Sequence, residues 1–332
     1  MSADRLTQAF EAQARACDRL GAPFTAALLR AAGVALDDGT TTGQRLLAWE
    51  GDLTATGDAA ALRLAGALHA RVRAGGAPAL APLYPPAPMP EAGALADAIA
   101  ETLRTEDADI RPWLDRPPQT NEVGRSAAVY PGLMAVAAAF DRPMALFELG
   151  ASGGLNLVPD RLAYVLGGAE FGDPSAPVTL APDWTGPPPA GPPPRIALRR
   201  GCDLTPLDLR SAEMRARLAA YIWPDQPARL ARLEAVAKIA GAEGISVESE
   251  AAASWIDARL AEAHPGLTRV VMHTIAFQYF DPVDRARITE RIEAEGAAAT
   301  EESPLAWLAL ELTSTEPTPA LTLRLWPGDG QP

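Results

Sequence analysis

Residues 147–157 read FELGASGGLNL, and this stretch decides the fold. The apolar run Met144–Leu149 is short enough to be a buried strand. It stops at Gly150, and the small residues that follow let the backbone turn tightly and approach a ligand closely. The apolar pattern from Leu155 onward favours a helix, whose N-terminus offers unpaired N–H groups and a partial positive charge. In a parallel sheet, nucleotide-like ligands bind at such a turn.

The same alternation of strand and helix continues to the end of the sequence. Short apolar runs predict further strands over 195–198, 244–247, 269–275, 305–312 and 320–326. Helical patterns between them predict helices over 155–166, 212–221, 228–240, 252–263 and 284–295. This alternation indicates an α/β fold with a Rossmann-like, mostly parallel sheet. Only the polar loop 313–319 separates the last two strands, so we expect an antiparallel hairpin at the sheet edge.

The sequence before residue 140 has a helical period instead. Leu6, Phe10 and Cys17 fall on one helix face, and the same spacing recurs in later segments. We therefore expect an all-helical region over 1–140 and a Rossmann-like domain over 141–332.

Two proline-rich segments interrupt these patterns. The segment 78–90 has six prolines in thirteen residues and divides the helical region. The segment 182–194 has seven prolines in thirteen residues, and we interpret it as an exposed insertion within the first crossover.

Composition excludes several classes of protein. The 332 residues are 48% hydrophobic, which supports a large core, and the net charge is -13. That excess of acid repels nucleic acid and anionic membranes, so we expect a small-molecule substrate. Two cysteines and three histidines, without metal-ligand spacing, predict neither a disulfide framework nor a metal site. The N-terminus lacks signal and lipidation patterns and no run of about 18 apolar residues occurs, so we expect a cytoplasmic protein without a membrane span.

Two interpretations of the glycine-rich turn fit poorly. A dinucleotide fingerprint fails because Ser152 and Leu155 stand where glycines are needed. A nucleophile elbow matches residues 150–154 letter for letter, with Ser152 as the nucleophile of a hydrolase. Such an elbow follows several strands, however, and here the upstream sequence is helical. The available bases are His273, inside a strand, and His264, on a loop.

A third interpretation is the first motif of S-adenosylmethionine methyltransferases, an acid followed by Gly-x-x-x-Gly. Glu148, Gly150 and Gly154 fit this motif. Asp203 ends the second predicted strand, where a carboxylate can accept hydrogen bonds from ribose hydroxyls. Glu250 follows the third, where an acid can meet the adenine amino group. A glycine-rich turn without any ligand, followed by solvated carboxylates, stays open as the alternative.

Five segments together resemble a bacterial family known as domain of unknown function 2332. They are residues 121–126, 148–157, 201–206, 223–226 and 273–279. The resemblance implies a methyltransferase-like Rossmann core behind a helical region, and it implies no substrate. Members of that family usually continue with a further strand, whereas this sequence ends at 328–332, which leaves a last edge strand open.

The candidate site residues follow from these segments. The expected ligand-binding residues are Arg125, Glu148, Gly150, Ser152, Gly154, Asn156, Asp203 and Glu250. Arg125 would pair with the carboxylate of a bound amino acid. After the fourth predicted strand, His273 could act as a general base, and Gln278 and Tyr279 could orient a methyl acceptor. The alternative for these three is a buried histidine with packing neighbours.

The expected activity is methyl transfer from S-adenosylmethionine to a small acceptor. Such a reaction requires alignment and desolvation of the reactants more than a fixed catalytic signature. The alternatives are a methyltransferase-like protein that binds ligands or partners without catalysis, and a serine hydrolase that uses Ser152. The acceptor and the oligomeric state stay open.

Overall fold

The computed structural model describes residues 2–313 and 318–328. The chain divides into two compact units, one of residues 1–120 and 216–231, the other of residues 121–215 and 232–332. The first unit is thus discontinuous in sequence, and its first segment ends at residue 120, before the boundary at residue 140 that the helical period suggested.

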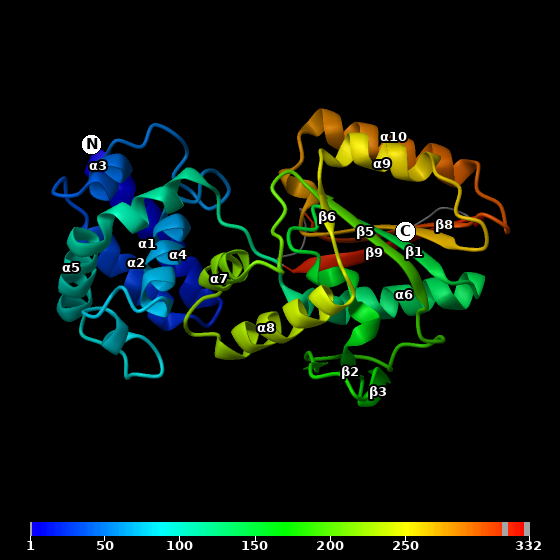
Figure 1. Cartoon of the computed structure of the whole chain (residues 1–332), viewed down its shortest axis with the longest axis horizontal. Helices are drawn as coiled ribbons and strands as arrows, with labels where there is room; N and C mark the ends of the chain where they lie inside the picture. The colour runs from blue at the N-terminus through cyan, green and yellow to red at the C-terminus, as the bar shows by residue number, and fades with distance from the viewer. Residues whose placement is uncertain (1, 314–317, 329–332) are drawn as a thin grey trace. The chain divides into compact units, whose positions relative to one another are not determined.

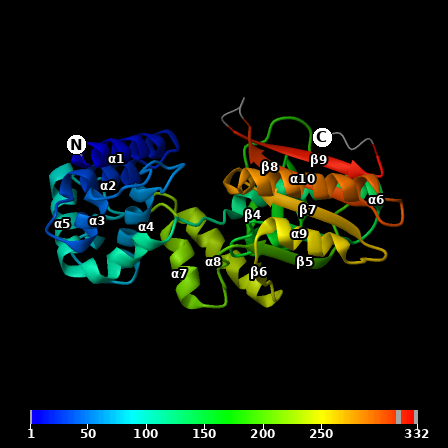
Figure 2. The same cartoon turned by 90° about the horizontal axis from the view of Figure 1, so that it is seen from above.

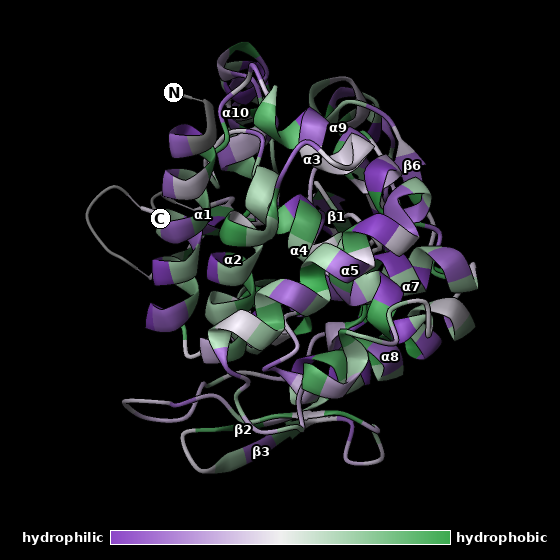
Figure 3. Ribbon diagram, turned by 90° about the vertical axis from the view of Figure 1, so that its left-hand side faces the viewer, coloured by the Kyte–Doolittle hydropathy of each residue, from purple (hydrophilic) through white to green (hydrophobic). Residues whose placement is uncertain are grey.

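The first unit is a bundle of helices around an alanine- and leucine-rich core. Its helices are α1 (Ser2–Arg19), α2 (Pro23–Ala35), α3 (Thr41–Leu47), α4 (Ala60–Arg73) and α5 (Ala92–Ile110), joined by the end of α7 (Ala212–Ala220) and the start of α8 (Pro227–Ala242). In Figure 3, α1 is mostly hydrophilic and α2 mostly hydrophobic. That contrast follows burial, because α1 buries only the face with Leu6, Phe10 and Cys17.

A carboxylate from the far segment caps α2. Ala22 precedes this helix and has no side chain that could accept from its first N–H groups. Asp225 does so instead: its two carboxylate oxygens accept from the backbone N–H groups of Phe24 and Thr25 at 2.7 and 2.9 Å. The Thr25 hydroxyl donates to the same carboxylate. Asp225 therefore ties residues 216–231 to the helices of the first unit.

The second unit is built on a six-stranded sheet in the order β6-β5-β1-β7-β8-β9 (Figure 1). The strands are β1 (Met144–Leu149), β5 (Ile196–Asp203), β6 (Val247–Ser249), β7 (Thr268–Thr274), β8 (Leu305–Leu312) and β9 (Pro319–Trp326). All neighbours are parallel except β8 and β9, which are antiparallel. The mostly parallel sheet and the antiparallel edge pair are confirmed. Within the loop 313–319, residues 314–317 lie outside the described residues, as do 329–332 at the end of the chain.

Helices cover both faces of this sheet. On one face lie α9 (Ala252–Ala261) and α10 (Pro282–Ala297), which run side by side in Figure 2 and bury Trp255 and Ile288 against the strands. On the other face lies α6 (Ser126–Phe140), which packs Leu133 against the sheet. Both faces of β1 are therefore buried, which explains why its sequence is a continuous apolar run.

One stretch, Val123–Phe140, is long and apolar enough by length and composition to cross a membrane. No such stretch was expected from the sequence. More than half of it, 56%, is buried inside the protein, because its α6 part packs on the sheet. The same criteria are met by core helices of globular proteins.

The helix predicted over 155–166 is wrong. Two short 3₁₀ turns, Leu155–Leu157 and Pro159–Arg161, lead instead into a small sheet of β2 (Ala163–Leu166), β3 (Ala169–Gly172) and β4 (Thr179–Leu180). The intervening Gly167 and Gly168 have φ of +59° and +80°, so they form a hairpin turn that a helix would not allow.

Replacement of Asp225 by alanine should destabilise the first unit by about 2 kcal/mol, since it removes charge-assisted hydrogen bonds to the start of α2. The free energy of unfolding from urea titration measures this. Asp97→Ala, an exposed position on α5, is the control and should change stability by less than about 0.5 kcal/mol. Equal effects of the two changes would contradict the capping role.

Candidate functional site

The candidate site lies where the carboxyl ends of β1, β5 and β7 meet. The chain passes from β1 to β5 and β6 on one side, and then returns to β7, β8 and β9 on the other side. The strand order therefore reverses between β1 and β7, and ligands of open α/β sheets bind beside such a reversal. In the register of the sheet, Glu148 of β1 stands between Gly201 and Met272.

The backbone after β1 turns sharply, as the sequence predicts. Gly150, Ser152 and Gly154 have φ of +70°, +53° and +75°, in the region that favours glycine. The turn is followed by a three-residue 3₁₀ turn and not by the expected helix, so no helix dipole points at this position. The N–H of Leu155 is already used, because it donates to Asn121 Oδ1 at 2.9 Å.

The glycines of this turn face other parts of the protein. A Cβ atom on Gly150 would lie 2.7 Å from Ala276 Cβ, and one on Gly153 would lie 2.8 Å from Leu209 Cδ1. A Cβ on Gly154 would lie 2.7 Å from Ile245 Cγ2. The glycines thus allow the loops after β7 and β5 and the segment before β6 to approach closely, and the space expected for a ligand over Gly150 holds Ala276 in this conformation.

Asp203, the last residue of β5, fixes the turn after β1. Its Oδ2 accepts from the backbone N–H of Ser152 and its Oδ1 accepts from that of Thr205, both at 2.9 Å. Glu250 is exposed, and its backbone N–H donates to the Asp203 carbonyl at 3.1 Å. The structure therefore brings Asp203 to the end of β1, while the Glu250 side chain faces solvent.

Glu148 is the most unusual residue of the site. It is only 1% exposed, and among the described residues neither of its carboxyl oxygens has a hydrogen-bond partner. Burial, with a smaller contribution from Asp203, raises the pKa of Glu148 to about 8, although Arg125 and Asn156 oppose the shift. With this pKa the carboxyl group carries its proton at pH 7, although Arg125 and the amide of Asn156 lie close enough to interact with it.

Two further polar atoms beside this turn are buried without partners in the described part of the chain, Ser152 Oγ and Asn156 Nδ2. Asn156 Oδ1 accepts from the Ser126 hydroxyl at 3.1 Å, which fixes the orientation of the amide. Buried polar atoms normally have partners, so this group of atoms indicates a place for a polar ligand or ordered water.

Arg125 connects the segment before α6 to the end of β7. Its Nη1 donates to the carbonyl oxygen of Thr274 at 2.6 Å. Burial lowers the pKa of the guanidinium, and the nearby acids Glu122, Glu148 and Glu311 oppose this. A cation and a buried carboxyl group thus lie near each other at the point where the strand order reverses.

His273 has a partner on each ring nitrogen. Its Nδ1 lies 2.7 Å from Glu311 Oε1, and its Nε2 accepts from Trp307 Nε1 at 3.0 Å. Phe277 stacks on the ring with centroids 4.6 Å apart. In this conformation the ring has no nitrogen left for an acceptor, so the general-base role expected for His273 lacks its main requirement. The histidine instead joins β7 to β8.

Glu311 was not among the site residues predicted from the sequence. Besides His273, it accepts from the backbone N–H groups of Ala276 and Phe277, and it thereby shapes the loop after β7. Burial raises its pKa, but these hydrogen bonds and His273 outweigh burial and lower it overall. The available signal was an acid within the otherwise apolar strand 305–312. Gln278 and Tyr279 lie on the same loop and are exposed, Tyr279 by 70%.

Ser152 has no base beside it. Its hydroxyl lacks a hydrogen-bond partner among the described residues, and the imidazole of His273 is occupied by Trp307 and Glu311. The positive φ of Ser152 resembles a nucleophile elbow, but a serine nucleophile needs a hydrogen-bonded base. Among the described residues, no group of three or more His, Cys, Asp or Glu side chains is arranged to hold a metal ion.

Comparison with known proteins shows which family the chain belongs to. A model described as an uncharacterized protein conserved in bacteria (DUF2332) matches residues 7–332. The chain belongs to this family. Searches of curated proteins and of solved structures gave no match.

The buried carboxyl group predicts an unusual pH dependence of stability. In the unfolded chain Glu148 ionises near its ordinary pKa of 4.5, whereas in the folded protein it keeps its proton up to about pH 8. Between these values the folded state binds one more proton, so the free energy of unfolding falls as pH rises, by up to about 1.4 kcal/mol per pH unit.

Glu148→Gln should remove this fall, which makes the variant progressively more stable than the wild type between pH 5 and pH 8. Urea unfolding at several pH values measures the difference. Glu250→Gln, at an exposed carboxylate, is the control and should follow the wild type. Parallel curves for wild type and Glu148→Gln would show that Glu148 is ionised in the folded state.

Proposed function

We propose that this protein is a methyltransferase that binds S-adenosylmethionine at the carboxyl ends of β1, β5 and β7 and methylates a small acceptor. The observation that carries the proposal is Glu148, an acid at the end of the central strand with two buried, unpartnered oxygens. The sheet order supports it, because a reversal beside β1 is where a nucleoside ligand finds a crevice.

The residues present fit the chemistry of this ligand. The ammonium of its amino-acid part is a partner for Glu148, and its carboxylate is a partner for Arg125 and for the Asn156 amide, whose unpartnered Nδ2 can donate. Asp203 already accepts two backbone hydrogen bonds, but a carboxylate has about four acceptor positions, so it can also accept from ribose hydroxyls. Glu250, exposed after β6, would lie toward the adenine.

Ligand entry requires a local movement in the second unit. The unpartnered atoms are buried, and Leu209 covers Gly153. Leu209 belongs to the loop 204–211 after β5, which is anchored to the turn by a hydrogen bond from Leu207 N to Ser152 O at 3.1 Å. We infer that this loop shifts when the ligand binds.

S-adenosylmethionine supplies a methyl group that its sulfonium has already activated. The acceptor's lone pair forms the new bond to the methyl carbon while the carbon–sulfur bond breaks and its electron pair stays on sulfur. The protein aligns the reactants and excludes water. Because His273 is fully hydrogen-bonded, we infer an acceptor that reacts without a protein base, with Gln278 and Tyr279 as exposed side chains that contact it.

A second candidate is a methyltransferase-like protein that binds the nucleoside ligand without catalysis. The occupied imidazole and the covered glycine turn favour it. Both candidates require binding, and only the first requires a methyl group to leave the ligand when acceptors are supplied.

Calorimetric titration with S-adenosylhomocysteine tests the site. Glu148→Gln should weaken binding at least tenfold, about 1.4 kcal/mol, because an amide cannot balance the ligand's ammonium. Asp203→Asn should weaken it similarly, since one acceptor oxygen is lost. The control is Asp208→Asn, an exposed acid on the adjoining loop, which should leave affinity unchanged. No binding by the wild type, or equal affinities in all variants, would overturn the proposal.

A further inference from the structure

The exposed apolar side chains of the second unit gather at one edge of its sheet. Among the described residues, its exposed large hydrophobic side chains are Leu204, Tyr279, Val283 and Leu312. Leu204 follows β5, Tyr279 and Val283 follow β7, and Leu312 ends β8. Single exposed apolar residues are ordinary on a protein surface, but these four all lie at the carboxyl edge of the sheet, beside the candidate site.

These residues stand on both sides of the turn after β1. Leu204 directly follows Asp203, whose carboxylate fixes that turn. On the other side, a Cβ atom on Gly150 would lie 3.5 Å from the ring of Phe280, which follows Tyr279 in sequence. Because β5 and β7 are both neighbours of β1, the ends of these two strands are about 10 Å apart. A molecule with one or two rings can therefore contact both sides.

Tyr279 also lies close to the residue expected to hold the methyl donor. It is near enough to Arg125 to raise the pKa of the guanidinium, although burial lowers that pKa overall. The face of an aromatic ring attracts a cation. The edge of the sheet thus presents an exposed ring that can bind a positively charged group.

The loops at this edge are acidic. The described loops that follow β1, β5, β6 and β7 carry three acids, Asp208, Glu250 and Asp281, and one base, Arg210. Arg210 pairs with Asp208 at 2.9 Å. Asp203 adds a further carboxylate at the end of β5. The charges of these loops therefore favour a bound cation over a bound anion.

We propose that the methyl acceptor is an apolar molecule with a nitrogen that carries no proton, such as the nitrogen of an aromatic ring, and that it docks against Leu204, Tyr279 and Val283. This inference rests on the proposed methyl transfer. It names the acceptor's chemical class from the apolar side chains and the acidic loops together.

The chemistry of such an acceptor agrees with the site. The lone pair of the nitrogen forms the new bond to the methyl carbon, while the carbon–sulfur bond breaks and its electron pair stays on sulfur. The positive charge thereby passes from sulfur to nitrogen and no proton is released, so the reaction does not need the occupied ring of His273. The acidic loops and the ring of Tyr279 favour the charge that develops on nitrogen.

Mass spectrometry of the methylated products tests the acceptor class, with isoquinoline and N,N-dimethylaniline as probes whose nitrogen carries no proton at pH 7. We expect the full chain with S-adenosylmethionine to form the quaternary product of each. Pyridine lacks the second ring of isoquinoline, so its kcat/KM should be at least about tenfold lower. The phenol 2-naphthol has a similar size but has to lose a proton, so it should react at least about tenfold more slowly than isoquinoline.

Tyr279→Ser and Leu204→Ser test the docking residues. Each change should raise the KM for isoquinoline at least about threefold because it removes apolar contact, while the affinity for S-adenosylhomocysteine changes less than about twofold. Val34→Ser, at an exposed apolar position on α2, is the matched control and should leave both values unchanged. Light scattering should give the same molar mass for the wild type and all three variants.

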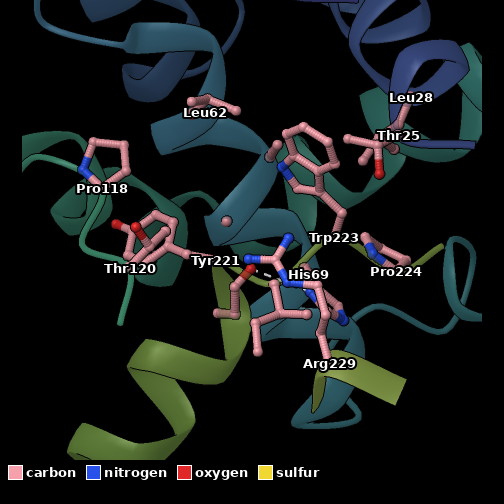
Figure 4. A pocket seen from close by; sticks show the side chains of 14 residues that line it. Thr25, Leu28, Leu62, His69, Pro118, Thr120, Tyr221, Trp223, Pro224 and Arg229 are labelled. Atoms are coloured by element: carbon pink, nitrogen blue, oxygen red, sulfur yellow. Dashed lines mark hydrogen bonds between the residues drawn. The ribbon is translucent and has the colours of Figure 1, made fainter. Parts of the chain in front are cut away.

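Small aromatic probes have a second apolar space to enter, a cavity of about 130 Å³ in the first unit. Figure 4 shows Leu28, Leu62 and Trp223 among the side chains around it. Ala65 belongs to the same wall, so Ala65→Leu fills the cavity, and Leu28→Phe does so if the first variant fails to fold. Neither change should alter the KM for isoquinoline.

A protein that binds S-adenosylhomocysteine but methylates neither isoquinoline nor N,N-dimethylaniline would overturn this inference and leave the proposed donor site standing. Equal KM values in the wild type, Tyr279→Ser and Leu204→Ser would overturn the docking site, as would a raised KM in a cavity-filling variant. A fall in molar mass in Tyr279→Ser and Leu204→Ser would also overturn it, because the edge would then be an interface between subunits. Absence of S-adenosylhomocysteine binding would overturn the proposed function and this inference with it.

Discussion

A carboxyl group buried in protein has to be neutral, paired with a cation or hydrogen-bonded, because its desolvation is otherwise too costly. Glu148 lies at the end of the central strand, and its two oxygens have no hydrogen-bond partner in the described structure. It therefore has to be neutral. Arg125, Asn156 and Asp203 are all close enough to affect its pKa. The protein thus keeps a strongly polar group in a place where it contributes nothing favourable to folding. Such a loss of stability is typical of functional sites. A cationic ligand would pair with the ionised carboxylate and offset the cost of burying its charge.

Carboxylates elsewhere in the chain show the opposite behaviour, because backbone N–H groups satisfy them. Asp203 ties the turn after β1 to the end of β5, and Asp225 caps α2. Asp107 does the same for α3, since it accepts from the N–H groups of Thr41 and Thr42. Glu311 orders the loop after β7 through Oε1, while its Oε2 is buried without a partner among the described residues. In each case an acid distant in sequence supplies what the local segment lacks, whereas Glu148 accepts no backbone hydrogen bond on either oxygen in the described structure.

The strands could be predicted because their periodicity is local: β1, β7, β8 and β9 are short apolar or alternating runs. The prediction of a helix over 155–166 was wrong because the conformation of this segment depends on groups outside it. Asn121 takes the N–H of Leu155, and the paired glycines at 167 and 168 turn a hairpin. The discontinuous first unit could not be predicted either, since it is held by contacts such as that of Asp225 with α2. Within the site, Glu148 and Asp203 could be predicted because both are acids at the ends of predicted strands. The partners of His273 could not be predicted, because they lie on a different strand, β8.

The central claim is that Glu148 is protonated in the folded protein near neutral pH and releases its proton to solvent when a cationic ligand binds beside it. Infrared difference spectroscopy between wild type and Glu148→Gln measures this directly, through the carbonyl stretch of a protonated carboxyl group. The account predicts that this band is present at pH 6.5, consistent with a pKa of about 8, and disappears when S-adenosylhomocysteine is added. Absence of the band in the ligand-free protein, or its persistence with saturating ligand bound, would contradict the account.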